Sequence, residues 1–148
     1  MLDHVRLTEY DGSISRIIDE LAPTKDYYPR YAEWLESTAA QGMHDGTRQI
    51  NILTNDHKTA GITITKNTQT EKKICTLFIH PDYRGEAWGY AMFTHACNIL
   101  RTTRPVITIP AIILPKYHGL IFAHHWKNTS QIANRYKDGI VEYGFNEH

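Results

Sequence analysis

The chain has 148 residues, of which 16 are basic, 16 are acidic and 41% are apolar. This length suits a single domain over residues 1–148, with a core large enough to fold without disulfides or metal ions as cross-links. The formal net charge of zero excludes a uniformly basic or acidic protein, so total charge predicts no partner.

The first 42 residues predict one strand and two helices. Residues 5–10 alternate apolar and polar side chains, which is typical of a half-buried strand. Asp11-Gly12-Ser13 then supplies a turn and a helix N-cap, and the isoleucines and leucine of residues 14–21 follow a helical period. A second helix is expected from about Pro29 to Gln41, with Gly42 as its C-cap.

The middle of the chain predicts an antiparallel meander followed by a helix. Residues 49–53, 60–65 and 73–79 are rich in β-branched and apolar side chains, and turn-like segments separate them. Residues 90–100 carry apolar side chains at helical spacing.

The last third begins with residues 106–109, a β-branched run between two prolines that is the best candidate for a central strand. Residues 116–126 have no clean period. We expect a short helix over residues 130–137 and a last strand over residues 140–145. The alternation of these elements predicts a mixed α/β fold.

Arg84-Gly85-Glu86-Ala87-Trp88-Gly89 lies between the third strand of the meander and the helix of residues 90–100. A strand, a tight glycine-containing turn and a helix start direct free backbone N–H groups and a helix dipole at one point. This arrangement predicts a phosphate site. Neither a G-x-x-x-x-G-K-[ST] loop nor a G-x-G-x-x-G loop is present, which sets aside P-loop and Rossmann proteins.

Residues 74–91 resemble the central motif of the GNAT superfamily of acetyl-CoA-dependent N-acyltransferases, a hydrophobic strand and turn followed by Q/R-x-x-G-x-G/A. Arg84, Ala87 and Gly89 occupy the three specified places, with Ala87 replacing the usual first glycine. The two helices between the first two strands also match that family. The resemblance implies a central, mostly antiparallel sheet flanked by helices.

The resemblance implies that acetyl-CoA is the cosubstrate, that its pantetheine lies along residues 73–79, and that the N–H of Phe78 or Ile79 polarises the thioester carbonyl. The residues expected to contact acetyl-CoA are Leu77, Phe78, Ile79, Arg84, Gly85, Glu86, Ala87, Trp88, Gly89 and Tyr90. The amine would attack the thioester directly, without a covalent enzyme intermediate. Cys75 and Cys97 lie in apolar patterns and are expected to be free, buried thiols rather than nucleophiles.

Members of that family commonly protonate the leaving CoA thiolate with a tyrosine within A-x-x-x-Y-x-x-x-G-F. The segment Ala133 to Ile140 is similar but one residue short on each side of Tyr136. Tyr136 is therefore the first candidate for the general acid, and Tyr117 is the second.

The general base is less well marked by the sequence. Glu71 precedes the pantetheine strand, while His118, His124 and His125 follow the central strand, and histidine is the residue type commonly used for proton transfer near neutral pH. Glu71 and His118 are the leading candidates. The spacing of these histidines matches no recognised ligand motif, so no metal site is expected.

The acceptor is expected to be a primary amine on a small molecule, a protein or an aminoacyl-tRNA. The aromatic group of Tyr27, Tyr28, Tyr31 and Trp34 could wall an amine pocket, and it could equally be core. Residues 84–137 carry seven basic residues and one acidic residue. This local excess of positive charge is compatible with an RNA partner. The alternative function is a non-catalytic module of the same fold that binds CoA or nucleic acid.

Two cysteines, the absence of any apolar run of roughly 20 residues and an N-terminus without a signal-like segment predict a cytoplasmic protein with no membrane partner. Relatives in the family often dimerise, so a homodimer is possible. The sequence carries no direct evidence for one.

Overall fold

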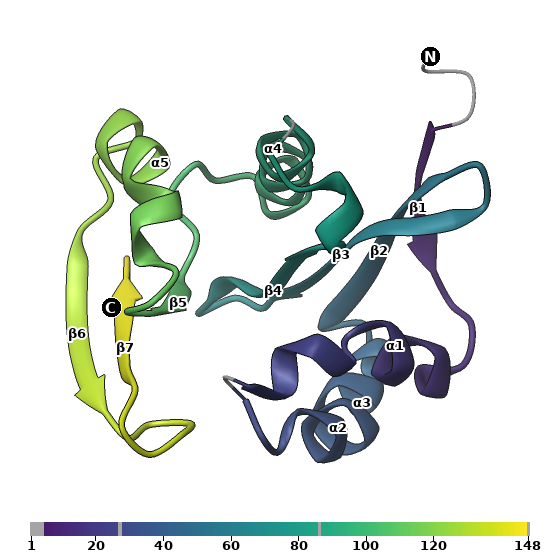
Figure 1. Cartoon of the computed structure of the whole chain (residues 1–148), viewed down its shortest axis with the longest axis horizontal. Helices are drawn as coiled ribbons and strands as arrows, with labels where there is room; N and C mark the ends of the chain where they lie inside the picture. Colours follow the sequence, from purple (N-terminus) through teal and green to yellow (C-terminus); the bar gives the residue numbers. More distant parts are fainter. Residues whose placement is uncertain (1–4, 27, 86, 148) are drawn as a thin grey trace.

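The computed structural model describes residues 5–26, 28–85 and 87–147. Its strands form two antiparallel sheets, one in the order β1-β2-β3-β4 and one in the order β5-β7-β6 (Figure 1). The strands are β1 (Val5–Tyr10), β2 (Arg48–Asn55), β3 (Lys58–Asn67), β4 (Lys72–Ile79), β5 (Ile107–Pro110), β6 (Asn128–Ala133) and β7 (Val141–Phe145). The mixed α/β architecture predicted from the sequence is confirmed.

Helices cover both faces of the four-stranded sheet. The segments α1 (Ile14–Glu20), η2 (Ala22–Asp26), α2 (Tyr31–Trp34), the π-helical turn η3 (Leu35–Ala39) and α3 (Ala40–Asp45) lie on one face, and α4 (Trp88–Leu100) lies on the other (Figure 1). The segments η4 (Pro81–Tyr83), η5 (Leu114–Tyr117) and α5 (His118–Ala123) follow β4 and β5. No helix within the described ranges is long and apolar enough to cross a membrane.

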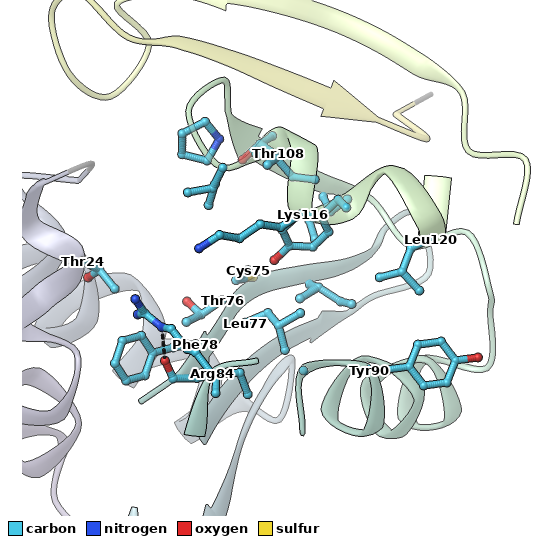
Figure 2. Close-up of a pocket in the computed structure, with 18 of the residues that line it drawn as sticks. Thr24, Cys75, Thr76, Leu77, Phe78, Arg84, Tyr90, Thr108, Lys116 and Leu120 are labelled. Atoms are coloured by element: carbon cyan, nitrogen blue, oxygen red, sulfur yellow. Dashed lines mark hydrogen bonds between the residues drawn. The ribbon is translucent and has the colours of Figure 1, made fainter. Parts of the chain in front are cut away.

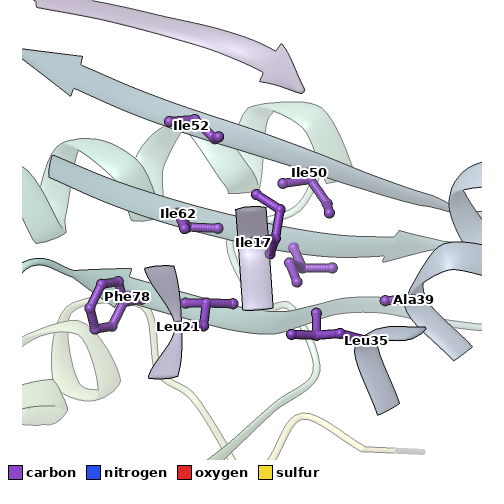
Figure 3. Packing of buried hydrophobic residues seen from close by; sticks show 9 residues of the cluster. Ile17, Leu21, Leu35, Ala39, Ile50, Ile52, Ile62 and Phe78 are labelled. Carbon is purple, nitrogen blue, oxygen red and sulfur yellow. The ribbon is translucent and has the colours of Figure 1, made fainter. Parts of the chain in front are cut away.

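The core consists of apolar layers on the two faces of the four-stranded sheet. Ile17 of α1 and Leu35 of η3 pack on Ile50, Ile62 and neighbouring sheet residues (Figure 3). On the other face α4 buries every third or fourth side chain, and these are Met92, Phe93, Ala96, Cys97 and Leu100. Each large apolar side chain removed from water stabilises the fold by about 1.5–3 kcal/mol, which accounts for the helical period seen in the sequence.

The helix predicted over residues 29–41 is longer than expected, because the helical segments from α2 to α3 follow each other directly to Asp45. Gly42 is not its C-cap. It is buried inside α3, where a Cβ atom would lie 2.7 Å from the Arg48 side chain. The helix ends instead at Gly46, whose φ of 84° is the left-handed conformation that glycine adopts without a Cβ penalty.

The helix predicted over residues 130–137 is wrong. Asn128–Ala133 is β6, which pairs antiparallel with β7, and Tyr136 lies in the turn that joins them. The residues of β6 have a low intrinsic preference for a strand, and the pairing with β7 outweighs it. Residues 116–126, which have no clean period, form the end of η5, the short helix α5 and the start of the connection to β6.

Candidate active site

Backbone hydrogen bonds join the two sheets at the start of β4 and directly before β5. The N–H of Ile74 donates to the carbonyl of Val106 at 2.9 Å, and the N–H of Val106 donates to the carbonyl of Lys72 at 2.8 Å. These bonds form one parallel bridge, and the described residues show no ladder beyond it. The strands then diverge, and a cavity of about 950 Å³ occupies the space between them.

A β-bulge in β4 decides which backbone groups face this cavity. Thr65 pairs with Ile74 and Ile64 pairs with Thr76, so Cys75 is an extra residue in the strand. Before the bulge the N–H of Ile74 points toward β5; beyond the strand the N–H of His80 donates to Ala60 on the β3 side. Backbone groups alternate sides along a strand, and the bulge interrupts this alternation once.

Counting back from His80, the N–H of Phe78 faces β3, whereas the N–H groups of Leu77 and Ile79 face the cavity. The carbonyl of Ile79 faces the same side, since it accepts a 2.9 Å hydrogen bond from Nε of Arg84 (Figure 2). Of the two amides expected to polarise a thioester, Ile79 is therefore correctly oriented and Phe78 is not. The N–H of Leu77 faces the cavity as well, because the bulge, which cannot be seen in the sequence, changes which amides of β4 point to that side.

The turn after β4 closes one end of the cavity. Gly85 has a φ of 85° and open space where a Cβ atom would stand, and Gly89 would bring a Cβ only to an ordinary 3.7 Å from Ile79. Helix α4 begins at Trp88, with Ala87 as N-cap, and its first intrahelical bond runs from Ala91 to Ala87. The first-turn N–H groups are thus presented as a helix N-terminus presents them to an anion.

Most residues predicted to contact the cosubstrate line this cavity. They are Leu77, Phe78, Ile79, Arg84, Gly85, Gly89 and Tyr90. Ala87 and Trp88 lie at the start of α4 outside the lining, and the Trp88 ring packs edge-on against Tyr83. Glu86 lies outside the described residues. The Arg84 guanidinium also stands 5.8 Å from the centre of the Phe78 ring, so it is held by two neighbours at the mouth of the site.

Tyr117 lines the cavity, whereas Tyr136 does not. Tyr117 comes from η5, directly after β5, and burial raises the pKa of its hydroxyl to about 12. Tyr136 stacks edge-on against Tyr28 at 5.2 Å between ring centres and is 40% exposed. The residues predicted as alternatives for one role therefore lie in different places, because the segment around Tyr136 is a hairpin turn rather than a helix.

The bases proposed from the sequence are not in the lining either. Glu71 pairs with Lys66 at 3.0 Å in the turn before β4. His118, the first residue of α5, is exposed, as is His125, and His124 is half-buried against Phe93. Within the described ranges, no group of three or more His, Cys, Asp or Glu side chains could hold a metal ion.

The aromatic group predicted near residue 30 is divided. Tyr28 and Tyr31 line the cavity, and the Tyr31 hydroxyl group shares a hydrogen bond with Thr76 of β4. Trp34 packs in the core and beneath Arg48, and Tyr27 lies outside the described residues. Both cysteines are free, as expected; Cys75 lines the cavity and Cys97 is buried in α4.

Two features of the site were not predicted. Lys116 of η5 extends into the cavity (Figure 2). Glu142 of β7 is only 2% exposed and accepts a 2.8 Å hydrogen bond from the Tyr28 hydroxyl group. Glu142 and Gly144 lie on the same face of β7, and their sequence pattern is typical of a solvent-exposed face. Only the tertiary contact with Tyr28 reveals that Glu142 is buried.

No protein-family model matches the sequence, and no curated protein is similar to it in sequence. Solved structures do match. A GNAT-family protein of Desulfovibrio desulfuricans superposes with a TM-score of 0.71 at 11% identity, covering 95% of this chain and 96% of that one. The ribosomal-protein-S18-alanine N-acetyltransferase of Escherichia coli superposes with a TM-score of 0.71 at 15% identity, covering 95% and 91%.

The spermidine N-acetyltransferase of Vibrio cholerae, solved with CoA and spermine, superposes with a TM-score of 0.67 at 12% identity, covering 96% of this chain and 94% of that one. These likenesses extend over nearly the whole length of each protein. The overall arrangement of strands and helices is thus shared with these proteins from end to end.

Proposed function

The fold is that of the GNAT superfamily, and on this premise we propose that the protein is an acetyl-CoA-dependent N-acetyltransferase. The observation that carries the proposal is the cavity between β4 and β5, which combines unpaired strand amides with a glycine-containing turn at a helix start. The acyl group would pass directly from the thioester to an amine, without a covalent enzyme intermediate.

The turn at Arg84, Gly85 and Gly89 fits the pyrophosphate of CoA. The open space beside both glycines lets a phosphate approach the backbone closely, and the Arg84 side chain adds a positive charge. The pantetheine would then lie along β4 in the place of a neighbouring strand, and the N–H and carbonyl groups of Leu77 and Ile79 would form hydrogen bonds with it. Ala87 is small enough to preserve this approach in place of the family's first glycine.

The N–H groups of Leu77 and Ile79 are suited to stabilise the oxyanion that develops on the thioester carbonyl. Such donors stabilise the transition state by several kcal/mol, about 2.7–4 for one donor, when they are held rigidly in a site that excludes water. We assign the proton for the leaving thiolate to Tyr117 rather than Tyr136. Burial raises the pKa of Tyr117 to about 12, so its hydroxyl group keeps its proton at neutral pH.

Cys75 is the thiol in the cavity lining, and its chemistry agrees with direct transfer. Burial is the largest influence on its pKa and raises it, so the thiol is protonated at neutral pH and a poor nucleophile. Burial likewise raises the pKa of Cys97 to about 11, and that thiol lies in the packed face of α4. Packing is the role we propose for both.

The acceptor enters, in this proposal, on the side of the cavity formed by Thr24, Tyr28 and Tyr31. Aromatic rings and hydroxyl groups together suit a protonated amine. The structural neighbours act, by their names, on spermidine and on the alanine of a ribosomal protein, and an aminoacyl-tRNA remains a further option here. The cytoplasmic location and a homodimer stay predictions.

Two measurements test the function. Calorimetry with acetyl-CoA measures donor binding, and thiol release from acetyl-CoA is then followed with a panel that contains spermidine and a peptide with a free N-terminal alanine. Binding and amine-dependent release support an acetyltransferase. Binding without release, together with RNA binding that falls steeply with salt, would favour the non-catalytic module instead.

A further inference from the structure

Tyr28 and Glu142 join the two halves of the molecule beside the cavity. Tyr28 follows η2 on the side of the four-stranded sheet, whereas Glu142 belongs to β7 in the three-stranded sheet. The hydroxyl group of Tyr28 donates to Oε1 of Glu142 at 2.8 Å, and Lys137 in the β6–β7 turn donates to the carbonyl of Asp26 at 2.6 Å. In Figure 1 the η2 segment and the β6–β7 turn accordingly approach each other at one end of the molecule.

Glu142 is held by groups from every element around it. Besides Tyr28, the hydroxyl group of Thr108 in β5 donates to it, and the charges of Arg135 in the β6–β7 turn and Lys73 in β4 act on it. Arg135 stands 3.8 Å from Glu147, so its charge is shared with a second carboxylate. Burial is the largest influence on Glu142 and raises the pKa of its carboxyl group, against the lowering effect of these neighbours.

A carboxylate in this position is costly for the fold. Removing a charge from water is expensive, and apolar side chains of similar size often replace buried ion pairs with no loss of stability. Two of the groups that bind it, Tyr28 and Thr108, are themselves part of the cavity lining. Glu142 is thus connected to the cavity through hydroxyl groups while being shielded from it.

The cavity lining otherwise offers no carboxylate or imidazole group among the described residues. Its ionisable side chains are Tyr28, Tyr31, Cys75, Tyr83, Arg84, Tyr90, Lys116 and Tyr117. Amine acetylation nevertheless needs a proton acceptor, because an ammonium group has no lone pair with which to attack a carbonyl. Glu142 is the carboxylate within one hydrogen bond of a lining hydroxyl group.

We infer that Glu142 receives, through the Tyr28 hydroxyl group, the proton that the acceptor ammonium group loses. The inference rests on the proposed N-acetyltransferase function. One proton passes from the ammonium nitrogen to the Tyr28 oxygen while Tyr28 passes its own proton to Oε1 of Glu142. Glu142 later releases that proton to water. Tyr28 is the catalytic residue in this relay, and Glu142 acts through it.

The remaining bonds balance without any further reactant. The amine lone pair forms the C–N bond, the C–S bond breaks, and the sulfur leaves with the bonding electrons. The second proton on the nitrogen passes to solvent water, while the thiolate gains a proton from Tyr117, which regains its own from solvent. The sum is one ammonium ion and one thioester giving one amide, one thiol and one proton.

The experiment compares wild-type protein with Glu142→Gln and Tyr28→Phe. Thiol release is measured from about pH 6 to pH 10, with spermidine and a peptide with an N-terminal alanine as probes. Glutamine can still accept the Tyr28 hydrogen bond but cannot take the proton at this pH. At about pH 7 we expect kcat/KM to fall by roughly 10²-fold or more in both variants, the usual range for loss of acid–base catalysis.

The pH profile separates a relay from a structural role. With spermidine, the rate of both variants should rise tenfold per pH unit and approach that of wild type at about pH 10, where much of the amine is already unprotonated. With the peptide, whose α-amino group has an ordinary pKa of about 8, the rise should end at about pH 8. Acetyl-CoA affinity should not change. Glu147→Gln is the matched control, because Glu147 is a neighbouring carboxylate that binds Ser130 and Thr129 and lies outside the cavity lining.

Profiles of Glu142→Gln that stay parallel to wild type at every pH would overturn the relay while leaving the acetyltransferase function intact. Should Glu142→Gln fail to fold, Tyr28→Phe decides, since a parallel profile for this variant overturns the relay equally. A folded wild-type protein that binds acetyl-CoA but releases no thiol with either probe would refute the proposed function first, and the relay with it.

Discussion

The hydroxyl group of Tyr28 and the carboxylate of Glu142, 114 residues apart in the chain, lie 2.8 Å from each other at the edge of the cavity. Their contact joins the helical N-terminal region to the last strand. It also places a buried acid and a hydroxyl group beside the cavity between β4 and β5.

Replacing Gly89 by glutamate should abolish acetyl-CoA binding. The substitution places bulk and a negative charge at the helix start, where the pyrophosphate is proposed to lie. Gly89→Ala is the matched control, because its Cβ would stand 3.7 Å from Ile79 in ordinary contact, and it should bind within a few-fold of wild type. Calorimetry measures both affinities, and unchanged binding by Gly89→Glu would refute the placement.

Tyr117→Phe should lower kcat by roughly 10²-fold while leaving acetyl-CoA affinity unchanged, because it removes the proton-donating hydroxyl group and keeps the ring. Burial raises the pKa of Tyr117 to about 12, so wild-type turnover should show no loss from Tyr117 ionisation up to about pH 10. Steady-state kinetics of Tyr117→Phe and Tyr136→Phe decide between the two tyrosines. A loss confined to Tyr136→Phe would restore the assignment made from the sequence.

Glu142→Gln should become more stable relative to wild type as the pH rises. Burial raises the pKa of the folded carboxyl group, so its contribution to stability is fully present below the ordinary glutamate pKa and is lost as pH rises through the folded value. Glutamine does not ionise and escapes this loss. Urea unfolding between about pH 4 and pH 8 measures the difference.

Glu147→Gln should show the opposite trend in the same experiment. The hydrogen bond from Ser130, followed by that from Thr129, lowers the pKa of Glu147, so its contribution is present above the ordinary pKa and is lost as pH falls through the folded value. Glu147→Gln should therefore lose stability relative to wild type as pH rises. Equal trends for the two variants would contradict the contrast between the two carboxylates.

Replacing Gly46 or Gly119 by alanine should change the free energy of unfolding in opposite directions. Gly46 ends α3 at a φ of 84°, a conformation that costs alanine about 1 kcal/mol. Gly119 lies within α5 with open space around a Cβ atom, so Gly119→Ala should stabilise the protein by ~0.5–1 kcal/mol through the helix preference of alanine. The free energy of unfolding, measured without ligand, checks both substitutions. An increase in stability for Gly46→Ala would contradict the role of Gly46 as the C-cap of α3.

The patterns that were interpreted correctly are those with a local cause. The hairpin between β2 and β3 turns at Asp56 and His57, both with positive φ, inside the segment expected to be a turn. Helix α4 was predicted from its apolar period and begins only two residues earlier than expected, at Trp88. Neighbours in sequence suffice for such features, because a turn or an amphipathic helix is defined over one or a few turns of chain.

The patterns that failed depend on partners far away in the chain. The strand β6 exists because β7 pairs with it, and the orientation of the Leu77 and Ile79 amides depends on a bulge opposite β3. The choice between Tyr117 and Tyr136 could not be made from a motif, since the imperfect match favoured Tyr136, whereas Tyr117 is the one that lines the cavity.

The sequence by itself determined the mixed α/β class, the meander and the strand–turn–helix at Arg84 to Gly89, because hydrophobic period, turn residues and small residues are local properties. Only the tertiary structure decided which amides face the cavity, which tyrosine reaches it, and that Glu142 is buried against Tyr28. The physical reason is that burial, pairing and proton transfer depend on distances between groups from separate elements, and those distances exist only after the two sheets have packed together.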